Sequence, residues 1–201
     1  MSIQIVAADV IELNPTAPPP EGEFIATECH APPCSITKLD VFFMIDATGS
    51  MSPAIEYVRR QLMGVITVLT ERLKIDVGYG LGIYRDFPHC FTTLLQVTPF
   101  NADTRTQIEQ AILAINASGG GDTPECQIFA FNAAASNASI PAWRPGSKRV
   151  IAWAGDAPGH DPSGGVTTEQ AIANLKLAHI SVSGISVGGD GLNARVEGDG
   201  A

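Results

Sequence analysis

The stretch that most constrains this chain runs from Leu39 to Ser52. A mostly apolar run, too short for a helix, ends abruptly in an acid, two hydroxyls and a glycine, in the order Asp46-Ala-Thr-Gly-Ser. We interpret it as a buried strand whose carboxyl end carries Asp46, Thr48 and Ser50 into a loop. Pro53 then opens a predicted amphipathic helix over about residues 53–73. Its apolar face is expected to hold Ile55, Val58, Leu62, Val65, Leu69 and Leu73.

A strand, a polar loop and a helix make the first half of a parallel α/β unit. Further strands are predicted over residues 75–84, 93–99, 148–154 and 180–187, and Pro99 marks the second of these as an edge strand. Helical patterns separate these strands. The alternation predicts an α/β fold with a doubly wound, mostly parallel, Rossmann-like sheet and helices on both faces.

Local signals predict where these helices begin and what covers one strand. Thr104–Gln107 and Thr167–Gln170 match the capping box. Thr123 is a good N-cap and Pro124 suits the first helical position, so a helix is expected from there to about Asn137. In the strand at 75–84, glycines alternate with apolar residues, and we expect backbone or a helix to approach its glycine face closely.

Length and charge limit the classes of function. The 201 residues fit one domain with a sizeable core, preceded by a segment of another kind. We divide the chain into residues 1–38, with a predicted strand, a proline-rich linker and an irregular lead-in, and a domain at 39–201. The net charge is −9 and no basic cluster occurs, so nucleic acid is not an expected partner. No apolar run is long enough for direct membrane insertion.

The four cysteines leave several interpretations open. Two disulfides and an oxidising compartment are compatible with the even count, but three pairings of Cys29, Cys34, Cys90 and Cys126 are open. Cys29, His30 and Cys34 could instead form a zinc half-site. Cys126 could be an unpaired core thiol.

Three loops that are remote in sequence are predicted to meet at one edge of the sheet. Each loop lies at the carboxyl side of the predicted sheet, where ligands of such sheets bind, and the loops contain Asp46, Thr123 and Asp156. With Thr48 and Ser50 they would surround one cavity with oxygen donors only. Such donors suit a hard cation, Mg²⁺ or Mn²⁺, and the charges are too few for a tight Ca²⁺ cage. An open coordination position would accept a carboxylate from another molecule.

The spacing of these residues resembles a known motif. Asp46-x-Thr48-x-Ser50, then Thr123, then Asp156 is similar to the metal-ion-dependent adhesion site of von Willebrand factor type A domains. Flanking words that resemble a subgroup of these domains are Ile-Asp-Ala-Thr-Gly-Ser-Met, Tyr-Arg-Asp, Gly-Gly-Gly-Asp-Thr-Pro-Glu and Gly-Asp-Ala-Pro-Gly-His, and the similarity covers about residues 38–189. Thr48 replaces the commoner serine and keeps the hydroxyl. The tail, residues 188–201, is interpreted as a shortened remnant of the family's closing helix.

The resemblance implies that these five residues hold a divalent cation, Mg²⁺ or else Mn²⁺ or Ca²⁺, and that the ion captures an Asp or Glu carboxylate of a protein partner. The implied activity is adhesion without turnover, at an extracellular or cell-surface location. The alternative is an intracellular, cytoplasmic adaptor of the same fold that works with an ATPase or a large complex. A more remote alternative is an aspartyl-phosphate phosphotransferase with Asp46 as nucleophile, which needs a lysine at the phosphate. Lys148 is expected at the wrong end of its strand.

Other titratable residues occupy the same loops. Asp86, Asp122, Glu125 and Asp161 could build a second ion site or steer a ligand, or they could be ordinary solvated acids. His160 could face the ligand, or it could be a surface histidine.

Overall fold

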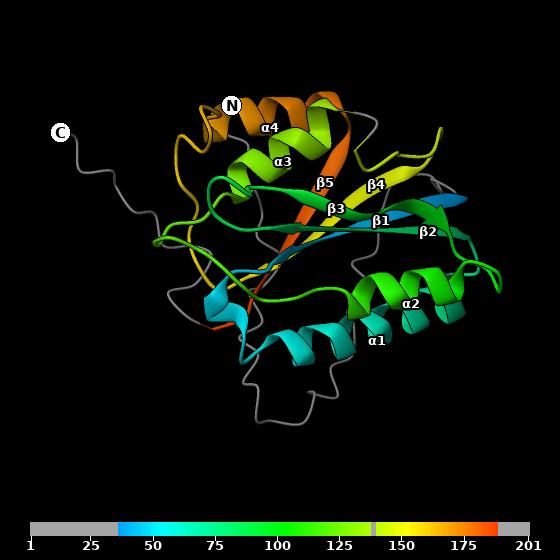
Figure 1. The fold of residues 1–201 in the computed structure, drawn as a ribbon. Helices are drawn as coiled ribbons and strands as arrows, with labels where there is room; N and C mark the ends of the chain where they lie inside the picture. Colours follow the sequence, from blue (N-terminus) through cyan, green and yellow to red (C-terminus); the bar gives the residue numbers. More distant parts are fainter. Residues whose placement is uncertain (1–35, 138–139, 189–201) are drawn as a thin grey trace.

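The computed structural model describes residues 36–137 and 140–188. Within them a five-stranded sheet has the strand order β3-β2-β1-β4-β5 (Figure 1). The strands are β1 (Lys38–Asp46), β2 (Asp76–Tyr84), β3 (Thr92–Pro99), β4 (Lys148–Gly155) and β5 (Ile180–Ser186). The helices are the 3-10 helix η1 (Gly49–Met51), then α1 (Ile55–Leu73), α2 (Arg105–Leu113), α3 (Gln127–Ser136) and α4 (Thr168–Leu177).

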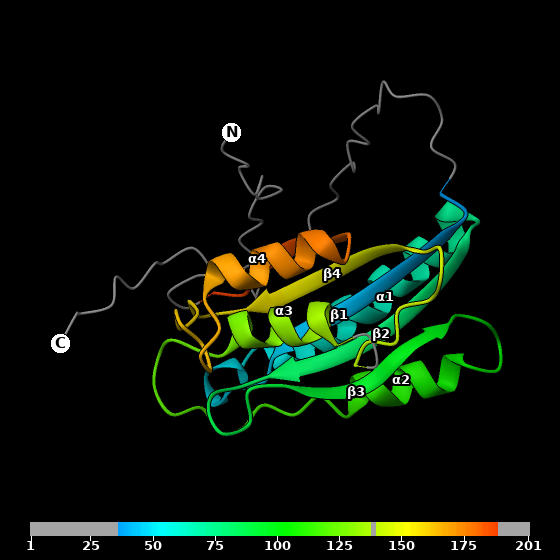
Figure 2. The same ribbon diagram turned by 90° about the horizontal axis from the view of Figure 1, so that it is seen from above.

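The sheet is parallel except for β3, which pairs antiparallel with β2 at one edge. Helices α1 and α2 cover one face, and α3 and α4 cover the other (Figures 1 and 2). The predicted doubly wound α/β fold is therefore confirmed. Strand β1 lies between β2 and β4, so the strand order reverses beside it, and the loop after Asp46 opens at the point where such folds bind ligands.

Strand β1 supplies core residues to both faces of the sheet, and every residue from Asp40 to Asp46 is buried. Phe42 and Met44 join the cluster that includes residues of α3 and α4, while Phe43 and Ile45 join the cluster of α1 and α2. This double burial explains the apolar run in the sequence, because a central parallel strand is covered by helices on both sides.

The first helix differs in detail from the prediction. It begins at Ile55, because η1 and a turn over residues 52–54 follow the Asp46 loop, so Pro53 does not open it. The buried residues of α1 are Val58, Leu62 and Ile66. Val65 and Leu73, predicted on the apolar face, are exposed. The buried stripe follows a spacing of four residues along the sheet surface, and Val65 lies outside it.

The predicted start of α2 is confirmed, with Thr104 as its N-cap residue, but the predicted capping box is absent and the predicted start of α3 is wrong. The Thr104 hydroxyl donates to the carbonyl of Pro99 at 2.6 Å and does not cap α2. Helix α3 begins at Gln127 and not at Pro124, because the amides before it bond to other loops: Glu125 N to Pro158 O, and Cys126 N to Arg85 O. The capping box of Thr167 and Gln170 is present as predicted.

Aromatic side chains cover the glycine face of β2. A Cβ atom at Gly80 would lie 2.6 Å from Phe42 Cδ2, and one at Gly82 would lie 2.7 Å from Phe91 Cε2. The predicted close approach to this strand is therefore confirmed, but backbone or a helix was the wrong expectation. Side chains of β1 and of the segment before β3 take the space that a Cβ would need.

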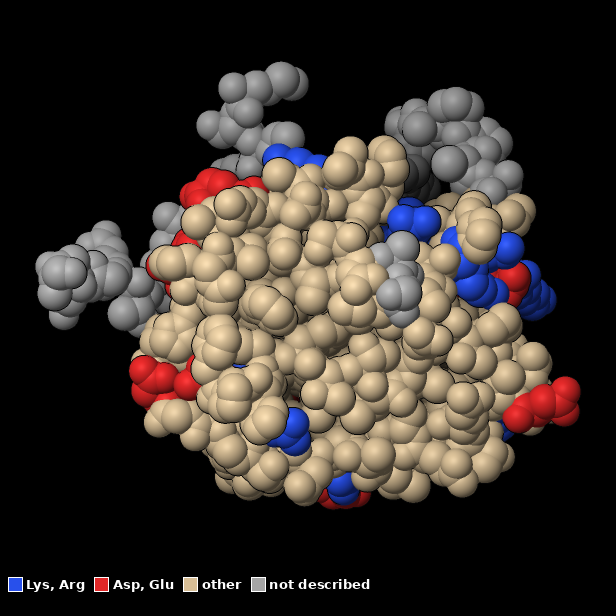
Figure 3. Space-filling view, turned by 45° about the horizontal axis from the view of Figure 1, so that its top comes forward, with Lys and Arg blue, Asp and Glu red and all other residues tan. Residues whose placement is uncertain are grey.

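The face shown in Figure 3 is mostly covered by uncharged residues, and its charged side chains lie mainly toward the edges. Among the helices of the described part, none combines the length and the hydropathy that crossing a membrane requires. A disulfide joins Cys90 and Cys126. The predicted N-terminal strand, linker and zinc half-site, and most of the acidic tail, lie outside the described residues.

Candidate metal centre

A series of short polar contacts joins four of the five predicted site residues. Asp46 Oδ1 accepts from Thr48 N at 2.9 Å and from Thr48 Oγ1 at 2.7 Å. The Thr48 hydroxyl lies 3.0 Å from the Ser50 hydroxyl, and Ser50 Oγ donates to Asp156 Oδ1 at 3.2 Å. Asp46 ends β1 and Asp156 follows β4, so the adjacent strands bring together residues that are 110 positions apart.

The carboxylate of Asp46 is buried, and no cationic side chain of the described residues pairs with it. Its side chain has no solvent exposure, and its Oδ2 atom has no hydrogen-bond partner among the described residues. Burial raises the pKa of Asp46 from 3.8 to about 6, against the hydrogen bonds from Thr48, and the charge of Asp156 adds to the rise. A buried carboxylate oxygen left without a donor is costly unless a cation binds it.

Gly155 allows the two acidic loops to lie side by side. A Cβ atom at this position would lie 3.2 Å from Asp46 Oδ2 and would overlap the hydroxyl of Tyr84. The Tyr84 side chain is fully buried and accepts a hydrogen bond from Trp153 Nε1 at 2.9 Å. Burial and the charge of Asp46 raise the pKa of Tyr84 well above its usual value, so this neighbour stays neutral.

The third predicted loop also lies against the Asp46 loop. Gly49 N donates to Gly119 O at 2.8 Å, and Ser118 N donates to Ala47 O at 2.9 Å. Thr123 belongs to this loop and is exposed. Within the described part of the chain, no hydrogen bond joins its hydroxyl to the other four site residues. The adjacency of the three loops is thus present, and cation binding by Thr123 stays a prediction.

Arg85 joins two of these loops, and the motif analysis did not assign it a role. Its Nε donates to Ala47 O at 2.9 Å and to Ser118 O at 2.8 Å, and its terminal nitrogen donates to Asn116 O at 2.7 Å. One guanidinium group thereby fixes the Asp46 loop against the loop at 116–123. The only sequence signal for Arg85 was its place in the Tyr-Arg-Asp word.

Glu125 is a second buried acid beside the centre. It is 3% exposed, and its Oε2 atom has no hydrogen-bond partner among the described residues. Burial raises the pKa of Glu125 from 4.5 to about 8, and the charges of Asp46, Asp86, Asp156 and Asp122 add to the rise. Of the other loop acids, Asp161 accepts hydrogen bonds from the backbone and hydroxyl of Thr168, and so anchors the start of α4.

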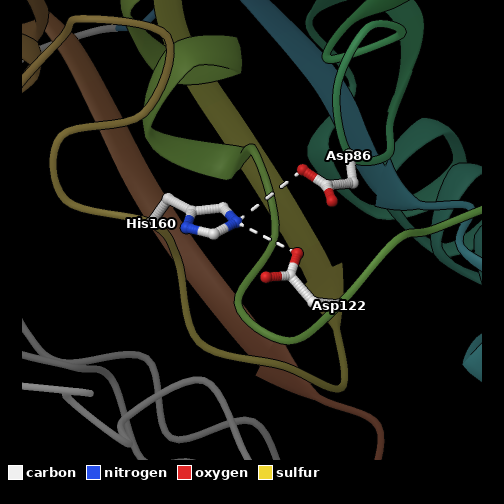
Figure 4. A group of neighbouring side chains, drawn as sticks. All are labelled: Asp86, Asp122 and His160. Carbon is white, nitrogen blue, oxygen red and sulfur yellow. Dashed lines mark ion pairs between the residues drawn. The ribbon is translucent and has the colours of Figure 1, made fainter. Parts of the chain in front are cut away.

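Asp86, Asp122 and His160 form a separate group (Figure 4). The imidazole Nε2 of His160 lies 3.7 Å from Asp86 Oδ1 and 3.6 Å from Asp122 Oδ1. The structure therefore brings together three of the five residues that the sequence named as ligand-facing or second-ion candidates.

The donors around Asp46 fit a hard divalent cation. They are two carboxylates and two hydroxyls, with no thiol or imidazole among them, and one buried carboxylate oxygen has no other partner. Oxygen donors of this kind are the ligands that Mg²⁺ and Ca²⁺ prefer. The two carboxylate charges, of Asp46 and Asp156, suit an ion that keeps some of its bound water molecules.

Comparisons with known proteins agree with the observed fold. The alpha-protein kinase vwkA of Dictyostelium discoideum is 32% identical over 127 residues, which are 61% of this chain and 19% of the kinase. The pilus adhesin SpaC of Lactobacillus rhamnosus GG, in its open conformation, is similar in structure, with a TM-score of 0.55 and 14% identity. That match covers 75% of this chain and 24% of the adhesin, and it shows the fold alone. The family model for the von Willebrand factor A domain matches residues 40–162, which is more than half of the chain, and the chain therefore belongs to the von Willebrand factor A domain family.

Proposed function

We propose that this chain is a divalent-cation-dependent protein-binding module without catalytic turnover. Asp46, Thr48, Ser50, Thr123 and Asp156 hold Mg²⁺, or else Mn²⁺ or Ca²⁺, directly or through water. The bound ion supplies a positive centre that accepts an Asp or Glu carboxylate of a partner protein. One observation carries the proposal: the buried, unpartnered oxygen of Asp46 at the end of a chain of hydroxyls and a second carboxylate.

The phosphotransferase alternative needs a lysine near Asp46, and Lys148 does not lie there. Lys148 pairs in register with Leu39 at the start of β1. It thus lies about 23 Å from Asp46 along the strand, at roughly 3.3 Å per residue. This separation supports a binding role for Asp46 over a role as nucleophile.

The location is proposed as extracellular or cell-surface. The Cys90–Cys126 disulfide supports an oxidising compartment, where such bonds persist. A second proposal, an adaptor module inside a larger cytoplasmic protein, is favoured by the kinase relative, of whose length this chain spans about a fifth. Thiol labelling of the protein from its native source distinguishes the two, because free Cys90 and Cys126 would favour the cytoplasm.

Asp46→Ala is expected to weaken Mg²⁺ binding by about a hundredfold or more, because even residues that only support a metal ligand cost 10–100-fold when removed. Isothermal titration with Mg²⁺ measures this. Asp46→Asn, which keeps the side-chain volume and one acceptor oxygen, should give a similar loss. Asp103→Ala removes an exposed acid from another loop and should bind like the wild type. Equal affinity in wild type and Asp46→Ala would contradict the proposal.

Arg85→Lys is expected to weaken Mg²⁺ binding by about tenfold, as for other groups that orient ligands without touching the ion. Lysine keeps the positive charge but cannot bond to three carbonyls from two loops at once. The same titration measures the change, with Arg105→Lys on the exposed side of α2 as control. An unchanged affinity would show that the loops hold their positions without Arg85.

A carboxylate-dependent interaction can be tested with peptides. We expect an acidic partner segment, once found, to bind only when Mg²⁺ is present, and to lose binding when its Asp or Glu is replaced by the amide. Binding that persists in the presence of a chelator would leave the fold assignment intact and remove the ion from the interaction.

A further inference from the structure

Three side chains from three loops converge beside the metal centre (Figure 4). Asp86 follows β2, Asp122 lies in the loop between α2 and α3, and His160 lies in the loop between β4 and α4. One ligand atom from each lies within 4.8 Å of the other two. Asp86 is mostly buried, whereas Asp122 is exposed, so the group is open to solvent on one side.

The distances within this group suit a shared ion better than direct pairing. The separations of 3.6 and 3.7 Å between the imidazole nitrogen and the two carboxylate oxygens are too long for hydrogen bonds. Two ligands of a tetrahedral ion, each at about 2.0 Å from it, lie about 3.3 Å apart. Movements of the exposed Asp122 and half-exposed His160 side chains would be needed to bring the three ligand atoms to such distances.

The backbone holds the three loops together. A Cβ atom at Gly121 would lie 2.9 Å from Asp86 Oδ2, so the glycine lets the chain before Asp122 approach Asp86 closely. The backbone amide of His160 donates to Glu125 O at 2.9 Å. The Cys90–Cys126 disulfide ties the segment after Asp86 to the start of α3. The convergence therefore does not depend on the three side chains attracting one another.

Glu125 gives an independent indication of a ligand. Its side chain is 3% exposed, and its Oε2 atom has no hydrogen-bond partner in the described part of the chain. The hydrogen bond from His160 N to its carbonyl oxygen holds Glu125 beside the loop of this group. A buried carboxyl group without a partner among the described residues is unfavourable unless a ligand or a water bonds to it.

We propose that Asp86, Asp122 and His160 form a second cation site, distinct from the Asp46 centre. This second site takes a divalent ion that binds an imidazole nitrogen, with Zn²⁺ as the representative ion. Imidazole together with two carboxylates is a donor set for Zn²⁺ and similar transition ions, whereas the oxygen-only Asp46 centre suits Mg²⁺. Three protein ligands leave a position for water or for a ligand atom.

Zinc titration in excess Mg²⁺ tests this site without relying on the first. With the Asp46 centre supplied with Mg²⁺, the full chain should bind one Zn²⁺ that His160→Gln and Asp122→Asn each weaken by about tenfold or more. Asp103→Asn, which removes another exposed loop acid, should leave Zn²⁺ binding unchanged. The imidazole ¹⁵N resonances of His160 should shift when Zn²⁺ is added. Cys29, His30 and Cys34 could bind a further zinc ion, so the readout is the ion that is lost in His160→Gln.

Equal Zn²⁺ stoichiometry and affinity in wild type, His160→Gln and Asp122→Asn would overturn the second site, whatever happens with Mg²⁺. The two proposals fail separately. Asp46→Ala should weaken Mg²⁺ binding by about a hundredfold or more and leave the His160-dependent Zn²⁺ in place. A variant chain that retains the wild-type melting temperature in the presence of a chelator confirms that a loss of Zn²⁺ is local and does not reflect unfolding.

Discussion

Replacement of Arg144 by methionine is expected to lower the free energy of unfolding by about 3–5 kcal/mol, the cost of leaving one partner of a buried ion pair uncompensated. Asp40 has no solvent exposure, and its Oδ1 accepts from Arg144 Nε at 2.5 Å. The same guanidinium group donates to Asp76 Oδ1 at 2.6 Å and to Leu39 O at 2.9 Å. Urea denaturation of the two proteins at neutral pH measures the difference.

A double variant separates the lost charge pair from lost packing. Asp40→Asn with Arg144→Met removes the buried charge, so part of the stability should return, since replacing both partners costs less than removing one. Mg²⁺ affinity should be unchanged in both variants, because Asp40 precedes Asp46 by six residues, about 20 Å along the strand. A loss below about 1 kcal/mol in Arg144→Met would mean that Asp40 is compensated by the amide of Arg144 and the hydroxyl of Ser147 alone.

The features that could be predicted from the sequence are those that depend on local pattern. The apolar run before Asp46 identified the central strand, because a strand buried on both faces has no polar alternation. The order of strands and helices then placed the Asp46 and Asp156 loops at the point where the strand order reverses, and the structure shows these two residues linked through Ser50.

The features that could not be predicted depend on contacts between distant residues. Arg144 is 104 positions from Asp40 and Arg85 is 38 from Ala47, and neither arginine lies in a pattern that indicates its partner. Thr123 and Pro124 have the composition of a helix start, yet the amides after them bond to Pro158 and Arg85. Tertiary hydrogen bonds of this kind outweigh local capping preference, which amounts to only about 1 kcal/mol.

Strand β1 carries two fully buried aspartates whose charged neighbours have opposite sign. Near one end, the oxygens of Asp40 accept hydrogen bonds from Arg144 and Ser147. At the other end, the charged neighbour of Asp46 is the carboxylate of Asp156, and Asp46 Oδ2 has no hydrogen-bond partner among the described residues. The first arrangement stabilises the fold by itself. The second is unfavourable in the metal-free protein, and this contrast within one strand is the physical argument for a cation at the Asp46 end.

The free energy of unfolding is expected to depend on pH through the ionisation of Glu125. Because the pKa of Glu125 is raised from 4.5 to about 8, the folded, metal-free protein keeps a proton there that the unfolded chain has released. Its contribution to the free energy of unfolding is therefore full below pH 4.5 and falls as the pH rises to about 8. At about 1.4 kcal/mol per pKa unit, the total change is roughly 4–5 kcal/mol.

Glu125→Gln should remove this dependence, because the amide does not ionise. Between pH 5 and pH 8, the free energy of unfolding of the metal-free variant should rise relative to that of the wild type by several kcal/mol, as measured by urea denaturation at both pH values. Asp46, with its pKa raised from 3.8 to about 6, adds a decrease at lower pH that both proteins share. Glu169→Gln, at an exposed position of α4, is the control and should follow the wild type. Saturating Mg²⁺ should reduce the difference between Glu125→Gln and wild type, because a nearby cation favours the ionised carboxylate. If the free energy of unfolding of the wild type changes with pH as that of Glu125→Gln does, then Glu125 ionises at its ordinary pKa and needs no compensating charge.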